Sequence, residues 1–105
     1  MKDVVTRFLE NVESRPGKPA VIVDNESVSY GQLGNLVKQI GSAVSAAGLH
    51  PRVLIYLDKG YEAYAAIFGT LMAGGYYCPI NMDAPAYRHH EIIEQFRPDI
   101  ILTSN

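Results

Sequence analysis

Cysteine is nearly absent from this chain of 105 residues, which carries Cys78 alone and no tryptophan. One thiol cannot form an internal disulfide, and no second cysteine stands at metal-ligand spacing, so nothing indicates an oxidising compartment. Long apolar runs are also missing, and acidic residues are scattered through the first sixteen positions. These absences exclude a membrane span and a signal peptide, and we expect a cytoplasmic protein.

Charge of one sign is lacking too. Nine basic and eleven acidic residues give a formal charge of −2, and neither sign gathers into a run. Because a nucleic-acid surface or an acidic-membrane surface needs clustered Lys and Arg, we expect neither partner. Hydrophobic residues make up 48% of the chain, which is enough for the core of one compact domain or of a piece of one.

Apolar spacing in the first third of the chain predicts a helix and then a hairpin. Apolar residues recur at i, i+3, i+4 and i+7 from Val5 to Val12, and Arg15-Pro16 ends that helix because a residue before proline avoids the helical region. The hairpin has β-prone runs at 20–23 and 27–29 around a polar turn. We expect this hairpin to cover a sheet edge.

The next segment predicts a capped helix and a buried strand. Ser29 can form a capping box with Gln32, and helical periodicity then continues to Gly48, a natural stop. Val53 to Leu57 is a nearly all-apolar run, as is typical of a strand covered on both faces in a parallel sheet.

The last half repeats this alternation. A second helix should bury its larger apolar residues, with small residues allowing close approach of neighbouring elements; those larger residues are Tyr64, Ile67, Phe68, Leu71 and Met72. A strand at 76–80, a helix at 86–96 and a strand at 100–103 follow. The sequence therefore predicts an α/β fold: an open three-layer sheet with a parallel βαβαβ core plus a short N-terminal hairpin.

The segment from Leu71 to Arg88, LMAGGYYCPINMDAPAYR, turns helix into strand and strand into loop. Gly74-Gly75 should supply left-handed positions that end the helix. The order L-x-A-G-G-x-Y-x-P-I-N, then P-x-x-R, together with VSYGQL at 28–33, resembles the early segments of the AMP-forming adenylate ligases. These are amino-acid adenylation domains, as in nonribosomal peptide synthetases, and acyl-CoA synthetases.

The resemblance covers nearly the whole chain, and it implies an N-terminal, incomplete part of an AMP-binding domain over residues 1–105. The parent enzyme would couple a carboxylate to ATP with Mg²⁺, form an acyl-adenylate, and pass the acyl group to CoA or to the pantetheine arm of a carrier protein. GGYYCPIN leans toward the amino-acid branch, although Asn81 stands where aspartate is usual. The stop directly after a strand likewise predicts a piece of a larger domain, which would be inactive alone.

No catalytic, cofactor-binding or metal-binding residue is predicted in this segment, because the family's phosphate loop and catalytic lysine lie downstream. Gly74-Gly75 precedes a strand rather than following one, and Thr103-Ser104 lacks the glycines and lysine of a phosphate loop. Arg88 is predicted to tie the hinge loop by hydrogen bonds. Cys78 is expected to be a packed, inert thiol.

The three histidines do not form a metal site in sequence terms. His89 and His90 point about 100° apart on one helix, and His50 lies far away in a turn. His89 shares a stripe with apolar residues and is expected to be partly buried and hydrogen-bonded, while His90 is expected to be solvated. Scattered acidic residues offer no acid–base pair; they are Glu91, Glu94 and Asp99.

Two other interpretations remain open. A free-standing α/β module could use its last strand edge, or the surface formed by its six clustered tyrosines, to dock onto a partner or a second copy. These tyrosines are Tyr56, Tyr61, Tyr64, Tyr76, Tyr77 and Tyr87. A flavodoxin-like phosphoryl-acceptor domain would have similar topology, with Asp58 after its strand as the candidate acceptor.

Overall fold

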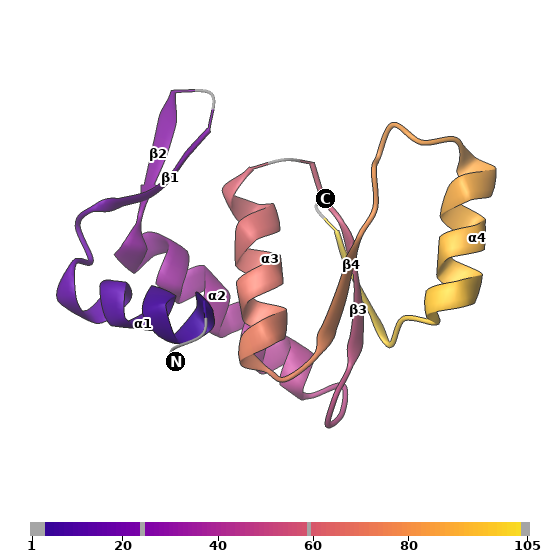
Figure 1. Ribbon diagram of the computed structural model, residues 1–105, viewed down its shortest axis with the longest axis horizontal. Coiled ribbons are helices and arrows are strands. Elements are labelled where there is room, and N and C mark those ends of the chain that lie inside the picture. Colours follow the sequence, from indigo (N-terminus) through magenta and orange to yellow (C-terminus); the bar gives the residue numbers. More distant parts are fainter. Residues whose placement is uncertain (1–3, 24, 59, 104–105) are drawn as a thin grey trace.

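Helices and strands alternate along the chain in the computed structural model, which describes residues 4–23, 25–58 and 60–103 (Figure 1). The predicted order of elements is confirmed, and the last helix and strand begin and end where the sequence placed them. The elements are α1 (Val4–Ser14), β1 (Pro19–Val23), β2 (Glu26–Ser29), α2 (Tyr30–Ser45), β3 (Arg52–Tyr56), α3 (Tyr61–Met72), β4 (Tyr76–Pro79), α4 (Ala86–Phe96) and β5 (Ile100–Thr103).

Three parallel strands form the main sheet in the order β4-β3-β5, and Leu54 on the central strand pairs with Cys78 and Ile101. Figure 1 shows α2 and α3 on one side of this sheet and α4 on the other. The predicted three-layer α/β fold is confirmed. Because β3 is covered on both faces, its residues Val53, Leu54 and Ile55 are at most 2% exposed.

The hairpin of β1 and β2 is a separate antiparallel sheet, and it does not pair with the main sheet in the described part of the chain. It packs against α2 and α3 and projects at the end of the molecule opposite α4 (Figure 1). The prediction that it covers a sheet edge is therefore wrong, since α3 lies between the hairpin and the strands of the main sheet (Figure 1).

The capping box at the start of α2 is confirmed. The amide of Gln32 donates to the Ser29 hydroxyl at 3.2 Å, and the Ser29 amide donates to the Gln32 side-chain oxygen at 3.1 Å. This helix packs on α1 and α3 around Phe8, Leu33 and Val37, which are at most 6% exposed. Phe8 stacks on Phe68 of α3 with ring centroids 4.7 Å apart, so aromatic packing joins the first and third helices.

The predicted close approach at the small residues of α3 is confirmed, but the larger residues are less buried than predicted. Tyr64 is 47% exposed and Leu71 38% exposed, whereas the small residues Ala65, Ala66, Gly69 and Thr70 are buried. The reason is a close helix crossing, because a Cβ atom at Gly69 would lie 2.8 Å from Cγ2 of Ile40 and 3.1 Å from the backbone nitrogen of Gly41 on α2. Large side chains do not fit there.

The turn between α3 and β4 uses its two glycines differently. Gly74 has a φ of +76°, which confirms the left-handed conformation predicted at this position. Gly75 does not share it; a Cβ atom at Gly75 would instead lie 2.7 Å from the carbonyl oxygen of Pro51. The second glycine therefore permits close backbone approach, and the Tyr76 amide donates to the same carbonyl at 2.8 Å.

Candidate functional site at the carboxyl edge of the sheet

The carboxyl ends of β3 and β4 lie side by side and lead to opposite faces of the sheet. β3 continues into α3, and β4 continues into α4 on the other side (Figure 1). The residues that follow these two strands line a hollow. Ligands of open α/β sheets bind outside the carboxyl ends of the strands, so this edge is the candidate site.

The larger hollow at this edge, which we call the β4-side cavity, has a volume of about 710 Å³. Much of its apolar lining comes from β3 and α3, and its polar lining comes from Asp58 after β3 and from Asn81 and Asp83 after β4. The lining residues are Ile55, Leu57, Asp58, Ala63, Ile67, Pro79, Ile80, Asn81, Met82 and Asp83.

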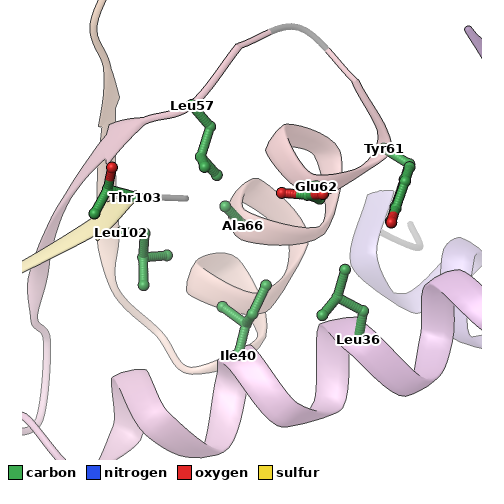
Figure 2. Close-up of a pocket in the computed structure, with 8 residues that line it drawn as sticks. All are labelled: Leu36, Ile40, Leu57, Tyr61, Glu62, Ala66, Leu102 and Thr103. Carbon is green, nitrogen blue, oxygen red and sulfur yellow. The ribbon is translucent and has the colours of Figure 1, made fainter. Parts of the chain in front are cut away.

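A smaller hollow, the β5-side cavity, has a volume of about 260 Å³ and lies between α2, α3 and the ends of β3 and β5. Figure 2 shows Leu57 and Leu102 pointing into it from the strand side, with Ile40 and Leu36 rising from α2. The remaining lining residues are Tyr61, Glu62, Ala66 and Thr103. Leu57 lines both cavities, so the end of the central strand divides the two hollows.

The charges around these cavities are unsuited to a nucleotide. Asp58, Asp83 and Glu62 bring carboxylates, and none of the described lining residues is basic. A triphosphate needs cations or converging backbone N–H groups. No cluster of three or more metal-ligating side chains occurs in the described ranges either. The described residues therefore do not fit the triphosphate of ATP, and most of what they offer is apolar surface for burial.

The loop after β4 is held by hydrogen bonds centred on Asn81. Its side-chain oxygen accepts from the Asp83 amide at 2.9 Å, and its carbonyl oxygen accepts from the Ala84 amide at 3.1 Å. Nε2 of His89 donates to the same carbonyl at 2.8 Å. The ring of His89 also meets Tyr56 edge-on with centroids 5.4 Å apart. The prediction of a partly buried, hydrogen-bonded His89 is confirmed.

The other two histidines lie elsewhere. Nδ1 of His50 lies 2.9 Å from the carbonyl oxygen of Gly74, so this residue braces the α3–β4 turn, which sequence spacing gave no means to foresee. His90 is exposed, as predicted, and its Nε2 lies 2.9 Å from Oε1 of Glu94 on the same helix.

Arg88 does not tie the hinge loop in the way the sequence suggested. Its guanidinium lies 3.8 Å from Glu91 on the same helix, with both side chains more than half exposed. Successive helical residues point about 100° apart, so Arg88 lies on the outer side of α4 while His89 faces the sheet. The loop contact comes from the histidine instead.

The remaining candidates are dispersed. Asp58 is exposed at the rim of the β4-side cavity, and Cys78 is half-buried on the edge strand β4. Asp99 serves the fold, because its carboxylate accepts from the Arg52 amide at 2.8 Å where α4 returns to the sheet. Tyr56 is half-buried; the other five clustered tyrosines are exposed and do not belong to the core, namely Tyr61, Tyr64, Tyr76, Tyr77 and Tyr87.

Comparison with known proteins gives consistent matches. The model of the AMP-binding enzyme family matches residues 8–105. An anguibactin system regulator from Vibrio anguillarum is 35% identical over 98 residues, which is 91% of this chain and 9% of that protein. An isonitrile lipopeptide synthase from Streptomyces coeruleorubidus is 29% identical over 107 residues, covering 100% of this chain and 7% of that protein.

A solved four-domain nonribosomal peptide synthetase, holo-AB3403 bound to AMP and glycine, has a TM-score of 0.88 and 31% sequence identity. The match covers 100% of this chain and 8% of that one. The chain thus spans less than a tenth of the length of these relatives. Within the described ranges, no helix has the length and apolar character needed to cross a membrane.

Proposed function

The chain belongs to the AMP-binding enzyme family, and we propose that its residues 1–105 are the N-terminal, incomplete part of an adenylation domain in an ATP-dependent ligase. The ligase activates a carboxylate as an acyl-adenylate and releases pyrophosphate. The observation that carries this proposal is the match of residues 8–105 to the family model, together with superposition of the whole chain on a synthetase bound to AMP and glycine.

The substrate class follows from the same neighbours. An amino acid is favoured over a fatty acid or aryl acid, because the superposed synthetase carries glycine beside AMP. In the second half-reaction the acyl group passes to a thiol, either the pantetheine arm of a carrier protein or CoA. ATP and Mg²⁺ serve the parent enzyme, and the lack of a basic side chain among the described lining residues supports binding of the triphosphate by other parts of that enzyme.

This chain's own contribution is a scaffold. The two apolar cavities at the carboxyl edge are surfaces against which the remainder of the adenylation domain packs, since burying apolar area of this kind stabilises a domain. The chain alone is therefore catalytically silent. A free-standing docking module or a phosphoryl-acceptor domain at Asp58 is not favoured, because neither accounts for the family match.

ATP–pyrophosphate exchange tests the proposal. The intact protein that carries this chain should exchange label in the presence of one amino acid from a panel that also contains aryl and fatty acids. The purified 105 residues should exchange none. Exchange by the short chain would refute its silence, and absence of exchange by the intact protein with every carboxylate would refute the ligase.

Packing at the carboxyl edge has its own test. Leu57 lines both cavities, so Leu57→Asp in the intact protein should abolish most of the exchange by placing a charge where apolar surface is buried. Leu49→Asp is the matched control, because Leu49 is 84% exposed and lines neither cavity. Equal loss of activity in both variants would contradict a specific role of the carboxyl edge.

A further inference from the structure

The loop between β4 and α4 forms one wall of the β4-side cavity through Asn81, Met82 and Asp83. The last strand-type hydrogen bond before this loop runs from the Ile80 amide to the Ile55 carbonyl oxygen at 2.9 Å. Beyond it, the Asp83 and Ala84 amides both bond to Asn81 itself. These bonds fix the shape of the turn, but they do not fix its place relative to the sheet.

No residue of α4 is fully buried, and His89 is one of its half-buried side chains. His89 supplies the connection. Its Nε2 donates to the Asn81 carbonyl oxygen at 2.8 Å, and its ring lies edge-on to Tyr56 at the end of the central strand, with centroids 5.4 Å apart. A single half-buried side chain therefore contacts the helix, the loop and β3 at once.

We propose that His89 is a positioning residue for the β4-side cavity: it holds the wall at Asn81–Asp83 against the end of β3. A carbonyl oxygen only accepts hydrogen bonds, so Nε2 must carry the proton. The inference depends on geometry alone and stands apart from the ligase proposal.

Hydrogen exchange in the intact protein tests the proposal with matched variants. Gln places an amide N–H close to the position of Nε2, whereas Asn is too short to reach it and Leu donates nothing. His89→Leu and His89→Asn should speed exchange of the Ile80 amide, whose bond to the Ile55 carbonyl oxygen joins the start of the loop to β3, about fivefold, the effect expected from losing one hydrogen bond. His89→Gln should restore exchange close to that of the unaltered protein.

Two internal controls accompany this comparison. His90→Gln changes the neighbouring exposed histidine and should leave amide exchange in the loop unchanged. The amides of Val53–Ile55 report on the sheet and should stay protected in every variant whose sheet is intact. Unchanged exchange at Ile80 in His89→Leu would overturn the proposal. Failure of His89→Gln to restore protection, when the sheet amides are intact, would overturn it equally.

The tautomer provides a second test that needs no variant to fold. In protein labelled with ¹⁵N only in histidine, two-bond correlation spectra of the neutral rings should show His89 as the Nε2–H form. His50 should show the opposite Nδ1–H form, because its Nδ1 faces the Gly74 carbonyl oxygen at 2.9 Å. An Nδ1–H tautomer at His89 would overturn the positioning role.

Discussion

Two glycines face each other where α2 crosses α3, and the structure predicts opposite outcomes when each becomes alanine. At Gly69 a Cβ atom would lie 2.8 Å from Cγ2 of Ile40, 3.0 Å from its Cβ and 3.1 Å from the Gly41 nitrogen. The last of these atoms is backbone, so the helices themselves must move apart. At Gly41 the nearest atom is Cε of Met72 at 2.6 Å, the free end of a flexible side chain.

The expected free energies follow from two opposing terms. Replacing Gly by Ala inside a helix stabilises it by about 1 kcal/mol. Overpacking a tight contact costs about 1–3 kcal/mol, and the upper half of that range applies where backbone must shift. Gly69→Ala should therefore lower the free energy of unfolding by about 1–2 kcal/mol. Gly41→Ala should lie between neutral and about 1 kcal/mol more stable, because Met72 can change rotamer.

Urea denaturation followed by circular dichroism measures both variants. With a denaturant slope of about 1–2 kcal/mol per M for a chain of this size, the midpoints of the two variants should differ by roughly 1 M. Each variant serves as the control for the other, since the substitution and the helix crossing are the same. A Gly69→Ala variant as stable as the unaltered chain would refute the reasoning, as would equal destabilisation by the two changes.

Three further substitutions probe single contacts by the same denaturation measurement. Ser29→Ala removes the hydroxyl that accepts from the Gln32 amide and should cost about 1 kcal/mol; no change would mean that the cap contributes nothing. Phe8→Ala empties a site only 6% exposed and should cost about 3–5 kcal/mol, with a loss under 1 kcal/mol contradicting the packing of α1. Asp99→Ala removes the acceptor of the Arg52 amide and should cost about 1 kcal/mol, while Asp99→Asn should retain most of the stability.

Much of the architecture was predictable because it depends on local signals. Apolar periodicity and turn residues gave the order of helices and strands, and the capping box at Ser29 lies within four consecutive residues. The all-apolar run at β3 predicted a strand covered on both faces, since a parallel strand between helical layers has no polar face. The family motif from Leu71 to Arg88 was equally visible in sequence and agrees with the family match.

The candidate site was not predictable, because its residues come from different elements. The cavities at the carboxyl edge combine α2, α3 and the ends of all three strands of the main sheet, so they form only once these elements have packed together. His89 was expected to find a hydrogen-bond partner, but its partner Asn81 depends on how the loop folds back.

Sequence alone thus determined what each segment becomes, through hydrophobic period, capping and glycine positions that act over a few residues. Tertiary structure decided which side chains are buried and which meet. The face of α3 that carries small residues is buried because the α2 backbone at Gly41 approaches Gly69 closely. Similarly, Nδ1 of His50 contacts the carbonyl oxygen of Gly74, which lies 24 residues further along the chain. Such contacts join residues far apart in the chain, and they are fixed by the packing of whole elements rather than by local preference.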